Sequence, residues 1–367
     1  MICFTWWGLT QYAARAIEAF NKVSKELVCV VATRPQSSPV EGMEQILTCP
    51  LVWVEAGDVD YVTRLPEIPR ILFVSNWNLP CWKYLERVVK SNGGKTVAMI
   101  DTNYKSFGVG NGRFKAFMRQ FTWIVRFRLS IRRRFDWFFV VGASGQKLMR
   151  ICGVPKSRLS VGLYGADSSL FRDGAPLTDR PKRIIYVGQF IGRKNVCRMI
   201  QAFLQAQDVA GEDASGWCLD MFGAGPLTNS LEQAIRQSNI PAITLHPFCQ
   251  PENLAAEYRN SRVFCLPSLE EHWGVVVHEA ALSGCALLLA NGIGAGDDFL
   301  GKDNGIAFDP FSVDAIMEAM VEVMRWGDVR WNRAHEESIC LSANFGLNRF
   351  VKSAGEICIG DGKRRVV

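Results

Sequence analysis

The sequence predicts an α/β protein with two Rossmann-like, doubly wound domains. Short apolar runs alternate with amphipathic helical patterns along the whole chain, which is typical of parallel sheets with crossover helices. The chain has 367 residues, of which 48% are hydrophobic and 21% charged, so it is long enough to fill two cores. A polar stretch at residues 168–183 contains Gly174 and two prolines and separates two predicted strands. We therefore place the domain join near residue 175.

The expected elements follow the same alternation in each half. In the first domain the predicted strands are residues 1–5, 27–33, 70–75, 95–100, 136–141 and 158–164. Clear helical patterns lie between them at residues 11–23 and 80–92. In the second domain the predicted strands are residues 183–188, 217–223, 242–246, 263–268 and 286–290. Helices are expected to begin near Asn195, Leu227, Asn253 and Val275, and residues 346–367 to form a C-terminal helix and a basic tail.

Composition limits the functional classes. Twelve cysteines occur singly and mostly within apolar runs, which favours reduced, buried thiols over zinc sites or disulfides. No apolar run is long enough to span a membrane, and the N-terminal stretch lacks the basic region of a signal peptide. A net charge of +6 is modest for this length, so we expect no nucleic acid partner. These features together favour a cytoplasmic protein.

The first candidate site element follows the strand at residues 183–188. That strand ends in Gly188 and continues through Gln189, Gly192, Arg193 and Lys194 into a helical pattern. Glycines that permit close backbone approach, together with cationic donors, suit a diphosphate, although a basic turn without a ligand has the same pattern. The GxG at residues 223–225 lacks a third glycine and is followed by Pro226, so it favours a tight turn over a dinucleotide fingerprint.

The second candidate element is the sequence PSLEEHWGVVVHEAALSG at residues 267–284. A buried strand precedes the loop that carries Glu271, and a helix follows that ends at Gly284. The first amide groups of this helix, from residues 274–276, have no internal acceptor and can bind an anion. Glu271 and Glu279 flank that position from two sides. A diphosphate with a hydroxyl-bearing sugar at each end fits this arrangement, and a nucleotide sugar has that structure.

Four segments of the second half together resemble a known family. The segments YVGQFIGRKNV, FGAGP, LHPFCQPENLAAEYRNSRVFCLPSLEEHWGVVVHEAALSGCALLLA and NGIAFDPFSVDAI, in this order and spacing, are similar to the C-terminal domain of family 4 glycosyltransferases of the GT-B fold. The resemblance covers about residues 183–325, with a specific Glu-x7-Glu element. It implies two domains facing a cleft, with residues 1–175 binding an acceptor and residues 176–345 binding a nucleotide sugar.

The resemblance also implies roles for single residues. Glu271 would contact hydroxyls of the donor sugar, and Glu279 would bind the ribose. Lys194 would hold the diphosphate together with backbone groups of Gly274, Val275 and Val276. Phe248 would border the base. No metal or cofactor is required, and a UDP- or GDP-sugar serves as the co-substrate.

Two positions depart from the family pattern. The family usually has an arginine where this chain has Gln189, next to Gly188, so a cation is missing near the leaving group. Arg193 is the candidate replacement. In the first domain a His-Asp pair is common in the family, and here only Asp101 is present. The expected catalytic set is therefore Glu271, Lys194, Arg193 and Asp101.

The resulting functional prediction is a retaining glycosyltransferase that moves a sugar to a glycan or lipid-linked acceptor, in surface polysaccharide synthesis. One alternative is a non-catalytic protein that binds nucleotide sugars, which the missing cation at Gln189 favours. Another is a metal-dependent GT-A-like transferase that uses Asp58 and Asp60, because a DxD pair can bind a divalent cation.

The segment at residues 113–137 combines many arginines with aromatic and aliphatic residues and has no acidic residue before Asp136. A basic helix of this kind can lie on an anionic membrane surface. The alternative is a crossover helix that packs its apolar side on the sheet and leaves its arginines in water. If this helix binds a membrane, the protein is a peripheral membrane protein on the inner face of that membrane.

Overall fold

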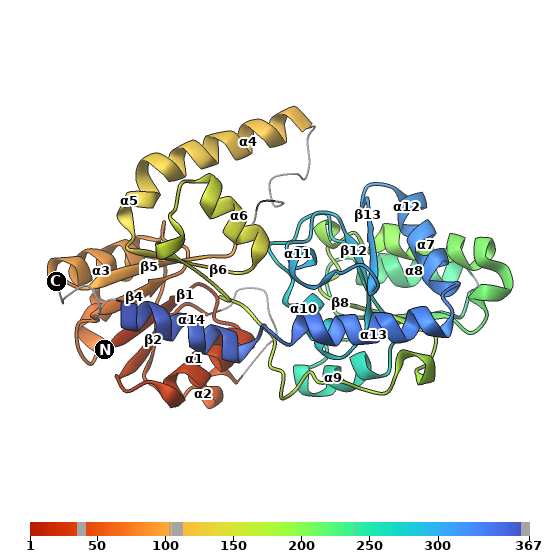
Figure 1. The fold of residues 1–367 in the computed structure, drawn as a ribbon, viewed down its shortest axis with the longest axis horizontal. Coiled ribbons are helices and arrows are strands. Elements are labelled where there is room, and N and C mark those ends of the chain that lie inside the picture. The colour runs from red at the N-terminus through yellow and green to blue at the C-terminus, as the bar shows by residue number, and fades with distance from the viewer. Residues whose placement is uncertain (35–41, 103, 105–112, 239, 361–367) are drawn as a thin grey trace. The chain divides into compact units, whose positions relative to one another are not determined.

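The computed structural model describes the chain except residues 35–41, 103, 105–112, 239 and 361–367 (Figure 1). The chain divides into two compact units. The first contains the described residues up to Gly165 together with those from Phe345 onward, and the second contains the described residues of Ala166–Asn344. The predicted basic tail lies outside the described residues.

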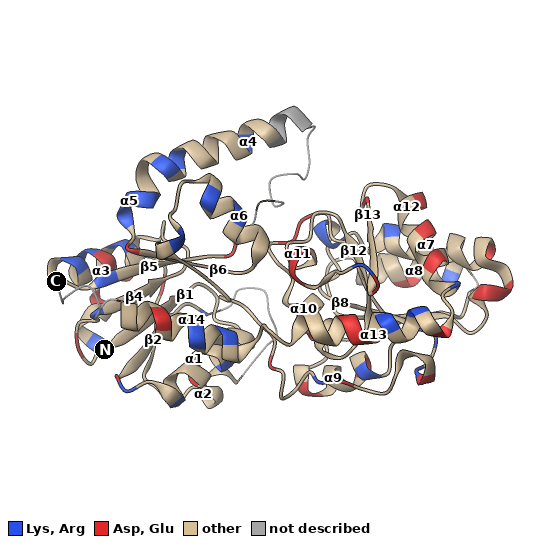
Figure 2. Cartoon of the chain, viewed as in Figure 1, with Lys and Arg blue, Asp and Glu red and all other residues tan. Residues whose placement is uncertain are grey.

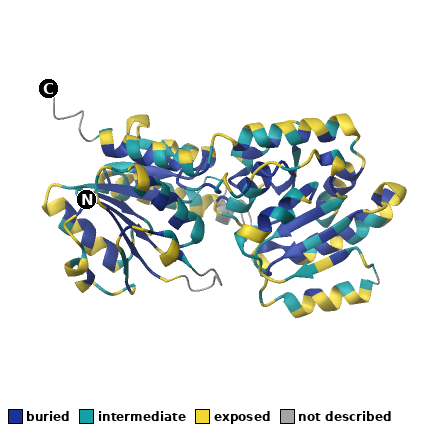
Figure 3. Cartoon of the chain, turned by 90° about the horizontal axis from the view of Figure 1, so that it is seen from below, coloured by how far each residue is buried: buried dark blue, intermediate teal, exposed yellow. Residues whose placement is uncertain are grey.

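The first unit has a seven-stranded parallel sheet in the order β3-β2-β1-β4-β5-β6-β7. Its strands are β1 (Ile2–Trp6), β2 (Val28–Ala32), β3 (Leu51–Trp53), β4 (Ile71–Val74), β5 (Lys95–Ile100), β6 (Trp137–Val140) and β7 (Leu159–Val161). The central strands are buried over nearly their whole length, as the dark strands of Figure 3 show. Continuous apolar runs form them because helices cover both faces of a parallel sheet.

Helices connect these strands and cover the sheet. They are α1 (Gln11–Val23), α2 (Met43–Ile46), α3 (Pro80–Ser91), α4 (Arg113–Arg126), α5 (Arg132–Arg134), α6 (Ala143–Ile151) and α14 (Leu347–Gly360). A π-helical segment, Phe127–Ile131, joins α4 to α5. Helix α14 comes from the end of the chain and packs beside α1, where Phe350 contacts Phe4 of β1 with ring centroids 5.9 Å apart.

The second unit has a six-stranded parallel sheet in the order β10-β9-β8-β11-β12-β13. Its strands are β8 (Arg183–Val187), β9 (Cys218–Phe222), β10 (Ile243–His246), β11 (Val263–Leu266), β12 (Ala286–Ala290) and β13 (Gly305–Phe308). Its helices are α7 (Val196–Ala210), α8 (Thr228–Ser238), α9 (Pro251–Arg259), α10 (Val275–Leu282), α11 (Gly296–Phe299), α12 (Val313–Met324) and α13 (Asp328–Ser342). The sheet order reverses at β8, and ligands of doubly wound folds bind at such a point.

The α/β class and the two doubly wound sheets are confirmed, but the boundary lies before residue 175. The polar stretch that the sequence predicts as a linker packs on the second unit instead. Phe171 is buried against Tyr258, with ring centroids 5.8 Å apart, and Leu177 is fully buried. Arg180 is also buried, and its guanidinium donates to the carbonyl of Ser261 at 3.1 Å. These contacts bind residues 166–183 to the second sheet, and the chain changes unit at Gly165.

The described cysteines are all free, as the sequence predicts, and most are buried. Cys197 and Cys340 are exposed on helices, and Cys218 and Cys249 are half-buried.

Candidate active site

Three loops meet at the carboxyl edge of the second sheet. The loop after β8 (residues 188–195) pairs with the loop after β9, because the amide of Phe190 donates to the carbonyl of Ala224 at 2.9 Å. The loop after β11 joins them, since the amide of Leu269 donates to the carbonyl of Arg193 at 2.8 Å. Both candidate elements of the sequence therefore lie at one edge, because parallel strands all end on the same side.

Lys194 and Glu271 form an ion pair at this edge. The Lys194 ammonium contacts Oε2 of Glu271, and the two side chains are only 10% and 13% exposed. Ser268 adds a hydroxyl 3.5 Å from the same carboxylate oxygen. Lys194 belongs to a 3-10 turn, Gly192–Lys194, which directs its side chain inward while Arg193 stays exposed. A pair so poorly hydrated holds two opposite charges at fixed positions, which is the preorganisation that an ionic ligand requires.

The N-terminus of α10 lies next to this pair. Gly274 has φ of 99°, a left-handed conformation that favours glycine, and a Cβ added there would lie 3.4 Å from Cγ of Glu271. Val275 and Val276 are in the first helical turn, so their amides have no acceptor within the helix. Their partial positive charge and Lys194 together suit an anion.

Glu279 lies on the same helix, one turn further along. The hydroxyl of Tyr258 donates to its Oε2 at 3.1 Å. Burial raises the pKa of Glu279 to about 7, and the bond from Tyr258 opposes that shift. The residue as a whole is half-buried. A carboxylate that titrates near neutral pH is typical of functional sites.

The remaining predicted residues of the second unit have less defined roles. Arg193 donates from its guanidinium to the carbonyl of Glu270 at 3.3 Å, on the exposed side of the loop. The carbonyl of Gln189 accepts from the Tyr186 hydroxyl at 3.0 Å. Phe248 follows β10 and is 37% exposed. Arg193 therefore has a protein partner on the exposed side of this loop, whereas the side chain of Lys194 points inward.

Glycines permit the close packing of the β8 and β9 loops. A Cβ on Gly223 would lie 1.9 Å from the carbonyl oxygen of Gly188, and one on Gly225 would lie 2.4 Å from that of Phe190. The predicted turn at residues 223–225 is therefore a point of backbone contact. These glycines place Gly188 and the loop that carries Lys194.

Asp101 lies in the first unit, directly after β5. The hydroxyl of Tyr164 is 3.4 Å from its Oδ2, and burial raises the pKa of Tyr164 well above its usual value. Tyr12 packs on Tyr164 with ring centroids 5.2 Å apart. Asp101 therefore lies beside the Tyr164 hydroxyl and two tyrosine rings at the carboxyl edge of the first sheet.

The DxD pair forms a local turn. Oδ1 of Asp58 accepts from the amide of Asp60 at 3.0 Å, and its Oδ2 pairs with Arg64 at 2.7 Å. Both Asp58 oxygens thus stabilise the 3-10 helix Asp60–Arg64 that follows. Within the described part of the chain, no cluster of three or more His, Cys, Asp or Glu side chains has the arrangement of a metal site.

Tyr258 was not predicted from the sequence. It lies on α9, four residues after the buried Leu254. This spacing predicts an ordinary core residue of an amphipathic helix. Only the packing of α9 against α10 brings its hydroxyl to Glu279.

The comparisons with known proteins agree with this geometry. Residues 167–334, which make up most of the second unit, match the family model "Glycosyl transferases group 1". The fold is GT-B, as its similarity to solved glycosyltransferase structures shows.

Individual relatives are distant in sequence. A 2-deoxystreptamine N-acetyl-D-glucosaminyltransferase of Niallia circulans is 22% identical over 144 residues, which span 39% of this chain and 36% of that protein. The structure of Anabaena HepE in complex with UDP and glucose has a TM-score of 0.72 at 12% identity and covers 98% of this chain and 100% of its own. A trehalose-6-phosphate synthase studied for glycosyl transfer with retention has a TM-score of 0.67 at 10% identity, with 100% of both chains covered.

The GT-B fold corrects one sequence-based alternative. A GT-A-like transferase that uses Asp58 and Asp60 does not fit a chain with two separate parallel sheets. The contacts of Asp58 with Arg64 and with its own backbone account for the pair without a cation.

Proposed function

We propose that this chain transfers a sugar from a nucleoside diphosphate donor, with retention of configuration, to a glycan or lipid-linked acceptor. The observation that carries the proposal is the Lys194–Glu271 ion pair beside the N-terminus of α10, with Glu279 one turn further along that helix. This arrangement offers cationic groups for a diphosphate and a carboxylate for the hydroxyl groups on either side of it.

The assigned roles follow from charge and position. Lys194 and the first-turn amides of α10 stabilise the diphosphate, whose negative charge grows as the bond to the sugar breaks. Glu271 accepts from hydroxyls of the donor sugar, and Glu279 accepts from the ribose. Phe248 borders the base. Before a donor binds, Glu271 neutralises Lys194, and the donor then shares that cation.

Retention without a covalent intermediate requires that the acceptor attack the face from which the diphosphate departs. The electron pair of the broken bond goes to a diphosphate oxygen, and the acceptor hydroxyl gives its proton to that same oxygen. No carboxylate then has to form a covalent intermediate. The relation to a trehalose-6-phosphate synthase studied for retaining transfer supports this stereochemistry.

The acceptor belongs to the first unit in this proposal. Asp101 and Tyr164 offer a carboxylate and a hydroxyl at its carboxyl edge, which suits a sugar hydroxyl. A role in surface polysaccharide synthesis, at the cytoplasmic face of a membrane, agrees with a lipid-linked acceptor. UDP is the first donor base to test, because HepE binds it.

The test is a turnover assay with UDP- and GDP-sugars, with and without EDTA. We expect transfer that survives EDTA, because Lys194 and the α10 amides supply the positive charge that a metal gives in other transferases. Loss of activity with EDTA and recovery with manganese would contradict the metal-free mechanism. Binding of donors without any turnover would support instead a non-catalytic nucleotide-sugar-binding protein, which the absence of a cation at Gln189 favours.

Donor binding should depend on pH through Glu279. The carboxylate must be ionised to accept from two ribose hydroxyls, and its pKa is raised to about 7. Affinity is therefore expected to increase with pH and to fall about tenfold between pH 8 and pH 6. Calorimetry with the donor sugar, whose diphosphate does not titrate in this range, measures the effect.

Glu279→Gln provides the matched control for that experiment. It keeps the shape of the side chain and removes the titration, so the affinity should be lower by about 1–3 kcal/mol at pH 8 and independent of pH. A pH slope that persists in Glu279→Gln would assign the titration to another group.

A further inference from the structure

Helix α4 and the π-helical segment after it have two apolar faces. Three of their side chains, Trp123, Ile124 and Phe127, pack against the core of the first unit. A second set points away from the core at intervals of four residues: Phe117 is 61% exposed, Phe121 52%, Val125 37% and Leu129 73%. We call this second set the apolar stripe. The side chains of residues 113–116 lie outside the described part of the chain.

The inner face fixes the helix in place. Phe127 is buried and contacts Trp123, Phe138 and Trp77, with ring centroids 5.0, 5.7 and 6.3 Å away. Gln120 donates from its side chain to the carbonyl of Tyr104 at 3.4 Å. The opposite side of the helix therefore packs on the core, and the apolar stripe faces away from it.

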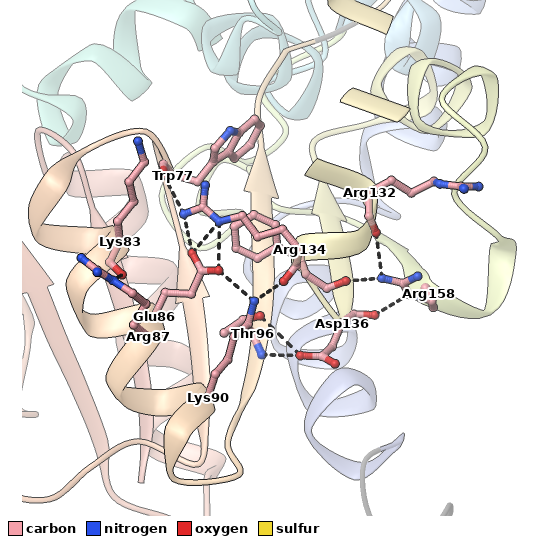
Figure 4. Close-up of polar contacts among 11 residues, drawn as sticks. Trp77, Lys83, Glu86, Arg87, Lys90, Thr96, Arg132, Arg134, Asp136 and Arg158 are labelled. Atoms are coloured by element: carbon pink, nitrogen blue, oxygen red, sulfur yellow. Dashed lines mark hydrogen bonds and ion pairs between the residues drawn. The ribbon is translucent and has the colours of Figure 1, made fainter. Parts of the chain in front are cut away.

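The C-terminal end of this element is held by charge (Figure 4). Arg134 pairs with Glu86, whose side chain is only 5% exposed, and Lys90 contacts the same carboxylate at 2.9 Å. Arg158 donates to the carbonyl of Asp136 at 2.6 Å. Arg132 donates to the carbonyl of Gly153 at 3.1 Å. The arginines of this segment therefore divide into two groups, and Arg132 and Arg134 serve the fold.

The second group of arginines remains exposed beside the apolar stripe. It consists of Arg119, Arg126, Arg128 and Arg133. No acidic residue occurs between Asp101 and Asp136, and α6 contributes the exposed Lys147 and Arg150. Figure 2 shows blue without red along the described part of α4 and α5. An apolar strip bordered by exposed positive charge complements an anionic lipid surface.

We propose that the apolar stripe and its exposed arginines dock this protein on an anionic bilayer. The helix lies in the plane of the membrane, with Phe117, Phe121 and Leu129 among the acyl chains near the headgroups and the arginines against lipid phosphates. None of the described helices has the length and hydropathy that crossing a bilayer requires. The proposal gives a lipid-linked acceptor its location, and in that sense it rests on the proposed function.

Flotation of the full chain with vesicles tests the docking without any donor. Wild-type protein should bind vesicles of equal parts phosphatidylglycerol and phosphatidylcholine and should bind pure phosphatidylcholine only weakly. Phe117→Asp with Phe121→Asp should abolish binding. Arg126→Gln with Arg133→Gln should weaken it by about fivefold for each arginine at low salt. The arginine effect should shrink in high salt.

Matched controls lie on α13 of the second unit. Val329 is 69% exposed, and Arg333 is exposed on the same helix, so Val329→Asp and Arg333→Gln change the same chemistry elsewhere. Both should bind vesicles as the wild type does. Circular dichroism and turnover with a soluble acceptor would show that the stripe variants are folded, and would reveal separately a failure of the proposed catalytic function.

Three results would overturn the docking proposal. One is equal vesicle binding by the Phe117→Asp, Phe121→Asp variant and by Val329→Asp. Another is equal binding of wild type to neutral and anionic vesicles. The third is a wild-type dimer in solution that the stripe variant converts to a monomer, because the stripe would then be covered by a second copy of the chain.

Discussion

Lys194→Ala is expected to lower kcat by about 10²–10³-fold, through loss of a charge that stabilises the departing diphosphate. The ammonium is almost fully buried and lies against Glu271, so its interaction with a phosphate is poorly screened. Arg193→Ala is expected to cost much less, because that guanidinium is exposed and donates to a backbone carbonyl. Steady-state kinetics with one donor for both variants compares the two cations.

Lys194→Ala also leaves the carboxylate of Glu271 without its cation, which can destabilise the second unit. The double variant Lys194→Ala with Glu271→Gln removes that charge, so it should recover thermal stability without recovering turnover. An equally damaging Arg193→Ala would contradict the ranking. It would instead indicate that Arg193 takes over the role of the arginine that the family usually has at the position of Gln189.

The location of this site could be predicted from the sequence because its residues lie in two short loops. Lys194 follows β8 and Glu271 follows β11, and both strands are unambiguous apolar runs. The family resemblance implied that these loops, 77 residues apart, bind the same donor, and the ion pair shows that they meet. That Lys194 and Glu271 pair with each other was not predicted, because side-chain direction depends on the 3-10 turn at Gly192–Lys194.

The parts that were not predicted depend on contacts between distant segments. Tyr258 reaches Glu279 only through the packing of α9 on α10, and no pattern in either helix indicates that bond. Strands β3 and β13 were not among the expected strands, because they have only three and four residues and most of these are not fully buried. The boundary near 175 was wrong because burial of Phe171, Leu177 and Arg180 cannot be read from a polar composition.

The segment at residues 113–137 illustrates the same limit. Its charge and amphipathic character were evident, but not which arginines are used by the fold. Glu86 comes from α3, and its pairing with Arg134 assigns one end of the segment to structure. Burial of Phe127 assigns the inner face to the core. Only the remaining side chains are available for a lipid surface.

Gly223→Ala is expected to destabilise the second unit by about 3 kcal/mol or more, because the added methyl group has no space. Its Cβ would lie 1.9 Å from the carbonyl oxygen and 3.0 Å from the carbonyl carbon of Gly188. Both are backbone atoms, so no side-chain rotation relieves the contact and the β8 loop itself has to move. That loop carries Lys194, so KM for the donor should rise together with the loss of stability.

Gly192→Ala is the matched control within the same loop. A Cβ at Gly192 has no atom within 4 Å, so the substitution should change stability by no more than about 0.5 kcal/mol. Thermal unfolding should show a Tm for the second unit that is roughly 6–12 °C lower in Gly223→Ala and nearly unchanged in Gly192→Ala. If Gly223→Ala instead keeps both its Tm and its KM, the β8 and β9 loops are not in backbone contact, and the placement of Lys194 must have another cause.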